Sequence, residues 1–389
     1  MKPRLERIRG HTLALLLALL TPLTSSALGD AERLRLIVDK TIRPLMSRHD
    51  IPGMAVALSV DGRSYVFNYG VASKQTRAPV TESTIFEIGS IGKMFTTTLA
   101  AYAQATGKLS LDEHPGRYLP HLAGMPIDQA TLLHLGTYTA GGLPLQFPDQ
   151  VKDDEAALTY LQAWQAQTPP GTMRAYSNPS IGLLGAATAA ALKDRFATLV
   201  ETQLLQKFGM RHTHIHVPAQ AMANYAWGYR QSKPVRVNPG PMDEPTYGIK
   251  STAADMLRFV QANLDPSGLD APLRRAVEAT QVGYFRVGGM VQGFGWEQFP
   301  HPLSRELLLG GNAEEVIFEP NPVQPVGPQW AAAPRLFDKT GSTGGFGAYV
   351  LFVPAKRIGL VMLANRNYPI PARVEAAYAM LEQLVPGQR

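Results

Sequence analysis

The stretch that decides the fold assignment reads Phe86-Glu87-Ile88-Gly89-Ser90-Ile91-Gly92-Lys93, and an apolar, helix-like run follows it. Ser90 and Lys93 form the only Ser-x-x-Lys pattern in the 389 residues. Positions i and i+3 are neighbours on a helix surface, so the Lys93 amine can reach the Ser90 hydroxyl. A serine hydroxyl needs such a base or cation to become a good nucleophile. Ser90 is therefore a candidate nucleophile, although so short a pattern also arises by chance, and a serine before an apolar helix is often only its N-cap.

Two further patterns follow along the chain. Tyr176 stands two residues before Asn178, and Lys339-Thr340-Gly341 enters an alternating β-type run. Each pattern occurs once, and both come after Ser-x-x-Lys. Together the three patterns resemble those of the class C serine β-lactamases, which belong to the penicillin-recognising enzymes.

The resemblance covers nearly the whole chain, from about Ile51 to Leu384. Beyond the three patterns, four longer blocks resemble class C sequences, at residues 137–149, 224–229, 247–252 and 363–369. Several similar blocks in the same order over such a length are far less probable by chance than a match to one short motif. The resemblance implies an α+β, β-lactamase/transpeptidase-like fold, with an antiparallel sheet flanked by N- and C-terminal helices and a mostly helical inserted domain.

The resemblance also implies catalytic roles. Ser90 would attack the lactam carbonyl and form an acyl-enzyme, while Lys93 and Tyr176 would take and relay its proton. A tyrosine normally has a pKa of about 10, so two cationic neighbours, Lys93 and Lys339, would be needed to favour its phenolate. By the same resemblance Tyr176 would activate the deacylating water. Whether Tyr176 or Lys93 is the acylation base stays open.

Substrate contacts follow from the same resemblance. The backbone N–H groups of Ser90 and Ser342 would form the oxyanion hole. Gln146 and Asn178 would hydrogen-bond the side-chain amide of the substrate, and Lys339, Thr340 and Asn367 would face its carboxylate. The remaining contacts would come from Gly341, Ser342 and Tyr247, although Tyr247 could equally only pack the cleft wall. Small residues at Gly341, Gly344 and Gly345 would let the substrate lie along the strand.

Two positions depart from the family pattern. The family commonly has an asparagine where Ile370 stands, between Pro369 and Pro371, so one polar contact to the carboxylate is missing. Asp338 stands where relatives often have His or Asn, and a carboxylate there could alter the partners of Lys339. Both departures bear on substrate preference and leave the acylation residues untouched.

Hydrophobic periodicity agrees with the implied fold. Helical spacing predicts a first helix over residues 31–49 and a closing helix over 372–384. β-rich runs predict one hairpin over 54–60 and 64–69, with its turn at Asp61-Gly62, and another over 348–353 and 358–363. The clearer helices between them are expected over 91–106, 155–167, 180–192 and 253–263. We therefore expect a discontinuous sheet-containing α/β domain from 28–85 and 310–389, a mostly helical domain from 86–309, and the active site in the cleft between them.

The first residues have the features of an export signal. Four basic residues precede an apolar run of 12 residues, Thr12 to Leu23, and small residues follow up to Ala27. A membrane-spanning helix would need about 20 apolar residues, so an anchor is the weaker interpretation. We expect residues 1–27 to be a signal peptide cleaved after Ala27 or Gly29, and the mature protein to be a periplasmic monomer without a membrane partner.

Charge and cysteine content exclude several classes of protein. The formal charge of +6 falls to +3 without the signal segment, which carries four basic residues and one acidic residue. No Lys/Arg block remains to bind nucleic acid. The sequence has no cysteine, which excludes disulfides, thiol catalysis and thiolate metal sites.

Two other motifs point to ligands but lack the necessary companions. His212, His214 and His216 would share one face of a strand and could bind zinc, but no acid or further histidine is close by in sequence, so a surface strand is preferred. The glycines around Ser90 imitate a phosphate loop, yet Glu87 replaces its first glycine and Met94 its magnesium-binding hydroxyl residue. We expect no metal and no cofactor.

The expected function is hydrolysis of β-lactam antibiotics, with cephalosporins favoured, through a serine acyl-enzyme that confers antibiotic resistance. A D-Ala-D-Ala carboxypeptidase or an esterase of the same fold would use the same serine, and so would a β-lactam receptor that does not hydrolyse its ligand. A class A enzyme is disfavoured because Ser-Asp-Asn is absent. The rate of deacylation separates these alternatives.

Overall fold

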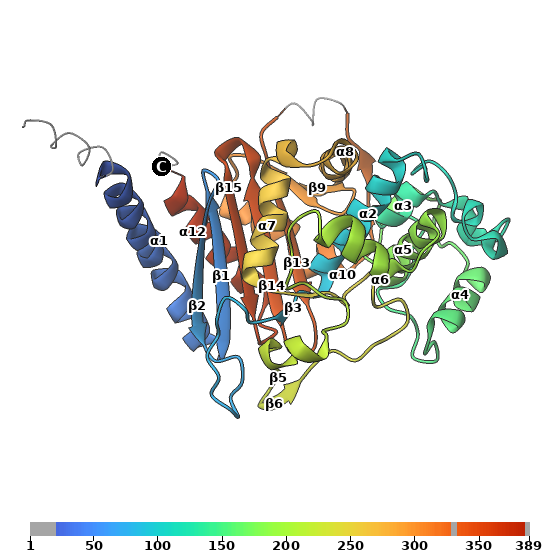
Figure 1. The fold of residues 1–389 in the computed structure, drawn as a ribbon. Coiled ribbons are helices and arrows are strands. Elements are labelled where there is room, and N and C mark those ends of the chain that lie inside the picture. The colour runs from blue at the N-terminus through green and yellow to red at the C-terminus, as the bar shows by residue number, and fades with distance from the viewer. Residues whose placement is uncertain (1–20, 328–332, 386–389) are drawn as a thin grey trace, which may run out of the picture.

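A computed structural model describes residues 21–327 and 333–385 (Figure 1). The first helix, α1, runs over Thr21–Arg48, and most of the predicted signal peptide lies outside the described residues. Within the described residues, no helix is both long enough and apolar enough to span a bilayer.

A nine-stranded antiparallel sheet forms the centre of the molecule (Figure 1). Its strands, in spatial order, are β12 (Gln324–Pro325), β8 (Gly283–Val287), β9 (Met290–Gly293), β10 (Glu297–Pro300), β13 (Arg335–Ser342), β14 (Gly347–Val353), β15 (Ile358–Ala364), β1 (Gly53–Val60) and β2 (Arg63–Gly70). β1 pairs with β15, with Met54 opposite Ala364, so the two ends of the chain meet inside the sheet. Both predicted hairpins are confirmed.

Helices cover both faces of this sheet, which explains why its central strands are apolar at almost every position. Leu360 and Met362 of β15 point into a core shared with α1, α9 (Arg305–Gly311) and α12 (Ile370–Leu384). Val361 and Leu363 point into the opposite core, with α2 (Lys93–Ala105), α7 (Ala253–Leu264) and α8 (Ala271–Thr280). The alternation of side chains along a strand therefore feeds two separate cores.

The remaining helices gather beyond the α2 side of the sheet (Figure 1). They are α3 (Leu132–Gly136), α4 (Asp154–Ala163), α5 (Asn178–Leu192), α6 (Phe196–Leu199) and α10 (Glu314–Phe318). Short two-stranded ladders lie outside the nine-stranded sheet. They join β3 (Phe86–Glu87) to β7 (Lys250–Ser251), β4 (Met173–Arg174) to β11 (Asn321–Pro322), and β5 (Gly228–Arg230) to β6 (Lys233–Val235). The four predicted middle helices are present as α2, α4, α5 and α7, and α4 ends four residues earlier than expected, at Ala163.

The sheet is wider than the two predicted hairpins suggest. Strands β8, β9 and β10 come from residues 283–300, inside the part predicted to be mostly helical. Glycines interrupt this segment so often that no strand in it exceeds five residues. The alternation of apolar and polar residues is therefore too short to predict strands there. The fold class is nevertheless the predicted one, and the division of the chain into domains stays a prediction.

Candidate active site

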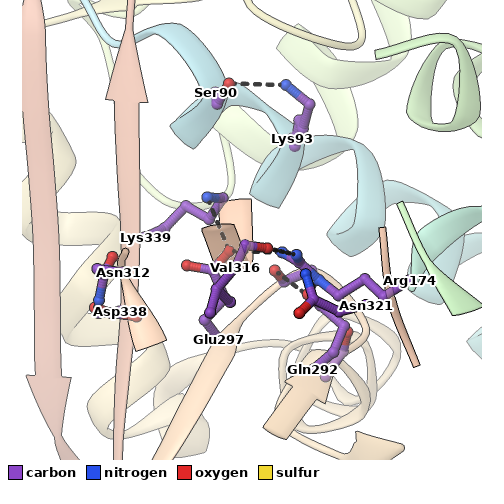
Figure 2. Close-up of polar contacts among 12 residues, drawn as sticks. Ser90, Lys93, Arg174, Gln292, Glu297, Asn312, Val316, Asn321, Asp338 and Lys339 are labelled. Atoms are coloured by element: carbon purple, nitrogen blue, oxygen red, sulfur yellow. Dashed lines mark hydrogen bonds and ion pairs between the residues drawn. The ribbon is translucent and has the colours of Figure 1, made fainter. Parts of the chain in front are cut away.

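Ser90 lies in a 3₁₀ turn, Gly89–Gly92, which leads directly into α2. Lys93 is the first residue of α2, and its Nζ lies 2.9 Å from Ser90 Oγ (Figure 2). Residues i and i+3 eclipse one another in a 3₁₀ turn, so the predicted proximity arises here without an α-helix at Ser90. Lys93 Nζ also donates to the carbonyl of Thr246, 3.2 Å away, which fixes the amine beside the hydroxyl.

Burial controls the charge of Lys93. The side chain is fully buried, and burial lowers the pKa of Lys93 because an ammonium loses its hydration there. Tyr176 opposes this effect, while the positive charge of Lys339 adds to it. The result is a pKa below the usual lysine value, which makes a neutral, proton-accepting amine more accessible.

Tyr176 lies between β4 and α5, with its ring flanked by both lysines. Lys93 Nζ is 5.2 Å and Lys339 Nζ 5.0 Å from the ring centroid. Burial by itself would raise the pKa of Tyr176, but the two ammonium groups and the Ser90 hydroxyl outweigh it and lower the pKa. The structure thus brings Ser90, Lys93, Tyr176 and Lys339 into one site.

Lys339 has a buried counterion that sequence reasoning missed. Its Nζ lies 3.2 Å from Glu297 Oε1, and both side chains are almost completely buried. Burial alone would lower the pKa of Lys339, but Glu297 and Tyr176 together raise it. A buried lysine that stays positively charged requires an anionic partner. That requirement signals the existence of such a carboxylate but not which of the acidic residues supplies it.

Glu297 lies between Lys339 and Arg174 and contacts both (Figure 2). The Arg174 guanidinium is also fully buried, 3.3 Å from Glu297 Oε1. It donates in addition to Gln292 Oε1 at 2.8 Å and to the Val316 carbonyl at 2.7 Å. These contacts join β4, β9, β10 and α10 beside the ring of Tyr176.

Asp338, the carboxylate that could have altered the partners of Lys339, makes no direct contact with this lysine. Adjacent side chains alternate across a strand, and Asp338 Oδ2 accepts hydrogen bonds from Tyr349 Oη at 2.6 Å and Asn312 Nδ2 at 2.8 Å. Burial, reinforced by the charge of Glu297, raises the pKa of Asp338 to about 7. Its influence on Lys339 is therefore electrostatic, through the sheet, and not a direct contact.

Two glycines let the Ser90 turn lie directly against the end of β13. A Cβ on Gly341 would lie 2.0 Å from the Ile88 carbonyl oxygen, and a Cβ on Gly89 would lie 2.5 Å from the Ser342 nitrogen. Gly89 also has a φ of +52°, which side chains disfavour. Gly341 therefore makes room for the chain's own backbone, and its contact with the substrate stays a prediction.

The other two glycines of this segment differ from one another. A Cβ on Gly345 would lie 2.9 Å from Gly228 Cα, so this glycine too is needed for contact within the chain. A Cβ on Gly344 would meet no atom within 4 Å, and Gly344 lines the candidate cavity. Of the three glycines predicted to make room for substrate, only Gly344 faces open space at the site.

A cavity of about 290 Å³ opens beside the Ser90 hydroxyl. It is lined by Ser90, Leu145, Gln146, Tyr176, Asn178, Val237, Tyr247, Phe318, Ser342, Thr343 and Gly344. The predicted residues Gln146, Asn178, Tyr247 and Ser342 therefore line it together. The apolar lining by Leu145, Val237 and Phe318 was not predicted, because single apolar residues in loops, or at the end of a short helix such as α10, carry no sequence signal for a binding site.

Some predicted substrate contacts are differently placed. Lys339, Thr340, Gly341 and Asn367 do not line this cavity. Asn367 Oδ1 accepts a hydrogen bond from Arg373, 2.6 Å away, and is held by α12. Asn178 Nδ2 donates to Gln146 Oε1 at 2.8 Å, so these two amides contact one another across the cavity wall. Ile370 is half-buried and packs against both cores.

The three histidines at 212–216 do not form the predicted strand. Only His214 makes a β-bridge, to Lys250. His216 Nε2 lies 2.9 Å from Glu244 Oε1 at the surface. Across the part of the chain that the structure describes, no group of three or more His, Cys, Asp or Glu side chains is placed to hold a metal ion.

A serine held against a buried lysine, beside a tyrosine between two ammonium groups, defines the class of penicillin-recognising serine enzymes. A family model described as Beta-lactamase matches residues 38–385, and the chain belongs to the β-lactamase family. It is 48% identical over 356 residues to a β-lactamase of Pseudomonas fluorescens, covering 91% of this chain and 99% of that protein. It is 42% identical over 371 residues to a β-lactamase of Escherichia coli K12, covering 95% of this chain and 98% of that protein.

Solved structures agree with this family and its class. A class C β-lactamase in complex with cefoxitin superimposes with a TM-score of 0.87 at 44% identity, over 91% of this chain and 99% of that one. The D-alanine carboxypeptidase AmpC from Burkholderia cenocepacia gives a TM-score of 0.86 at 50% identity, with the same coverage. The resemblance to class C serine β-lactamases is thereby confirmed.

Proposed function

We propose that the protein hydrolyses β-lactam antibiotics, cephalosporins in particular, through an acyl-enzyme on Ser90, and so confers antibiotic resistance. One observation carries the proposal above all: Ser90 Oγ lies 2.9 Å from the buried Lys93 Nζ, beside a Tyr176 whose pKa is lowered. This arrangement supplies a nucleophile and proton acceptors beside an open cavity of about 290 Å³.

The reaction begins when Ser90 Oγ attacks the lactam carbonyl and its proton passes to Lys93 or Tyr176. The backbone N–H groups of Ser90 and Ser342 stabilise the oxyanion, a contribution of about 2.7–4 kcal/mol for each donor. The C–N bond then breaks, and the same proton goes to the leaving nitrogen. Tyr176 next takes a proton from the water that attacks the ester carbonyl. It then gives this proton to Ser90 Oγ as the ester C–O bond breaks, which restores the serine hydroxyl.

Substrate recognition is proposed from the lining of the cavity. Gln146 and Asn178 present amides to the acyl side chain, and Tyr247 and Val237 border it. Lys339 is proposed to attract the carboxylate of the substrate, since its contact with Glu297 uses only one of the three N–H donors of its ammonium group. Thr340 and Asn367 are proposed as the remaining carboxylate contacts, and Ile370 leaves that end of the site less polar.

A D-Ala-D-Ala carboxypeptidase is the second candidate. Two similar solved structures, from Burkholderia cenocepacia and Pseudomonas syringae, have D-alanine carboxypeptidase in their titles, the second together with β-lactamase. Both reactions share the acylation of Ser90. They differ in whether water rapidly releases a β-lactam acyl group.

The experiment is a turnover assay with a chromogenic cephalosporin, benzylpenicillin and a D-Ala-D-Ala peptide side by side. We expect fast lactam turnover that Ser90→Ala abolishes and that EDTA leaves unchanged. A stoichiometric burst without turnover would favour a receptor or a peptidase. Release of D-alanine without lactam turnover would assign the carboxypeptidase, and inhibition by EDTA would point to a metal site.

Export to the periplasm, cleavage after Ala27 or Gly29, and a monomeric mature protein are part of the same proposal. A periplasmic location suits an enzyme that meets β-lactams before they reach the cell wall. Expression of the full chain, followed by mass spectrometry of the periplasmic fraction and light scattering, tests all three statements.

A further inference from the structure

Glu87 is a buried carboxylate, three residues before Ser90, that the proposed reaction does not use. It lies in β3 and is 1% exposed. Glu87 Oε1 accepts hydrogen bonds from Tyr225 Oη at 2.6 Å and from the Val237 backbone N–H at 2.7 Å. Glu87 Oε2 accepts a third, from Thr343 Oγ1 at 2.5 Å. A carboxylate this deeply buried is costly to the fold unless its hydrogen bonds stabilise it.

The three donors come from two segments that are far apart in the sequence. Tyr225 and Val237 belong to the loop region around β5 and β6, and Thr343 belongs to the turn that follows β13. Val237 and Thr343 both line the cavity that contains Ser90. One side chain therefore joins two lining residues to the strand that leads to the nucleophile.

A carboxylate is well suited to this position. It is purely an acceptor with room for several donors, and hydrogen bonds to a charged acceptor are roughly twice as strong as neutral ones. The nearest cations are engaged elsewhere. Arg236 stacks on Tyr225 and Trp227, 4.0 and 4.1 Å from their ring centroids, and Lys250 Nζ donates to the Ile215 carbonyl at 2.8 Å.

The hydrogen bonds of Glu87 connect residues that are far apart along the chain. Glu87 is 150 residues from Val237 and 256 residues from Thr343 in sequence. Neither the Val237 segment nor the Thr343 turn lies within the nine-stranded sheet. The positions of Val237 and Thr343 in the cavity lining therefore depend on such individual contacts more than on a continuous ladder.

We propose that Glu87 is a positioning residue that fixes Val237 and Thr343 in the lining of the cavity, and so limits the size of the substituent that the acyl group can carry. The inference rests on the proposed function, because it assumes that Ser90 is acylated from this cavity. Glu87 touches no substrate and acts only through these two lining residues.

The test compares wild type with Glu87→Gln and Tyr225→Phe on two cephalosporins, one with a small and one with a bulky acyl side chain. Glu87→Gln replaces one acceptor oxygen by an amide nitrogen that cannot accept from Thr343, and Tyr225→Phe removes the hydroxyl that donates to Glu87 Oε1. We expect the bulky-to-small ratio of kcat/KM to rise by about tenfold in Glu87→Gln, a change typical of small alterations in a pocket. The change should lie mainly in KM, and Tyr225→Phe should move the ratio the same way but less.

A double variant supplies the control for this mechanism. If both residues act through one network, adding Tyr225→Phe to Glu87→Gln should change the ratio little further. Should Glu87→Gln fail to fold, Tyr225→Phe alone tests the inference, because its hydroxyl lies outside the cavity lining. A ratio equal to wild type in the folded variants, or an equal loss for both substrates, overturns the proposal.

Acylation of Ser90 is followed by mass spectrometry in parallel with turnover. A wild type that is acylated but does not turn over contradicts the proposed function. The inference about Glu87 can still be tested in that case, from the ratio of the acylation rates for the bulky and the small cephalosporin. A wild type that acylates neither substrate overturns both statements. An unchanged ratio with normal wild-type turnover overturns this inference alone.

Discussion

Glu297 is the buried anion that determines the charges around Tyr176. It raises the pKa of Lys339 against the effect of burial, which keeps this lysine positively charged. It also opposes the formation of a Tyr176 phenolate, because two negative charges repel one another. The carboxylate thus stabilises the cation that Tyr176 needs, while it weakens the effect of that cation on Tyr176.

Replacing Glu297 by glutamine should move both limbs of the pH profile of kcat/KM to lower pH. The acid limb follows Tyr176, whose pKa falls when the repulsion ends, and the alkaline limb follows Lys339, whose pKa falls when its counterion is lost. We expect shifts of about one pH unit or more. Glu306→Gln, which removes an exposed carboxylate on α9, is the control and should leave both limbs in place. Limbs that stay unmoved in Glu297→Gln would contradict this assignment.

Asp338 should make the stability of the protein fall as the pH rises from about 4 to 7. Burial, together with Glu297, raises its pKa from 3.8 to about 7, so the folded state holds a proton that the unfolded chain releases in this window. Asp338→Asn removes this loss while keeping an acceptor for Tyr349. Between pH 4 and pH 8 the variant should gain about 2–4 kcal/mol of unfolding free energy relative to wild type. Urea unfolding of both proteins at several pH values measures this gain. Plots of unfolding free energy against pH that run parallel for wild type and Asp338→Asn would exclude the effect.

The N-terminus of α5 fixes two residues of the candidate site at once. Ser177 caps this helix by accepting from the Ser180 backbone N–H at 3.1 Å. Tyr176 precedes the cap and Asn178 follows it. The geometry of both therefore depends on where the helix begins.

Ser177→Ala should cost about 1 kcal/mol of unfolding free energy, the usual effect of losing a cap. It should also lower kcat/KM several-fold, because Tyr176 and Asn178 lose their fixed orientation. Asp153→Ala is the matched control, since Asp153 caps α4 with a 2.8 Å bond to the Ala156 N–H and does not line the cavity. It should lose similar stability with unchanged kinetics. Equal kinetic losses in both variants would show that the cap has no special role at the site.

Elements with a continuous pattern were predicted well. The hairpins β1–β2 and β14–β15 were recognisable because their runs of seven or eight residues end at clear turn residues. Strands β8 to β10 were not, because each is short and bounded by glycines or a neighbouring turn. The 212–216 segment was wrongly assigned as a strand, because its alternation reflects burial of Thr213 and Ile215 without a ladder.

The site forms where the nine-stranded sheet meets the turn that begins α2. This junction is close because Gly341 and Gly89 carry no side chain, and the Ile88 carbonyl occupies the place of a Gly341 Cβ. The distance between Ser90 and Ser342 is therefore a property of how the whole molecule packs.

Gly341→Ala should push β13 away from the Ser90 turn, because its Cβ would start 2.0 Å from a backbone oxygen that cannot move by itself. We expect kcat/KM to fall by about 100-fold, the cost of a misplacement of about 1 Å. Gly359→Ala creates a similar clash in the same sheet, 2.4 Å from Val260 Cγ1 and away from the site. It should lose stability while its kinetics stay near wild type. A Gly341→Ala enzyme with wild-type kcat/KM would show that the junction tolerates such a shift.

The sequence by itself determined what depends on neighbours along the chain. Ser90 and Lys93 meet because they are three residues apart, and the hairpins form because their strands adjoin a turn. The family resemblance then brought in Tyr176 and Lys339. Only the tertiary structure decided which groups surround them, since Glu297 is 42 residues from Lys339 and Glu87 is 256 residues from Thr343. Such contacts depend on which faces of distant elements pack together, and no local pattern of residues encodes that choice.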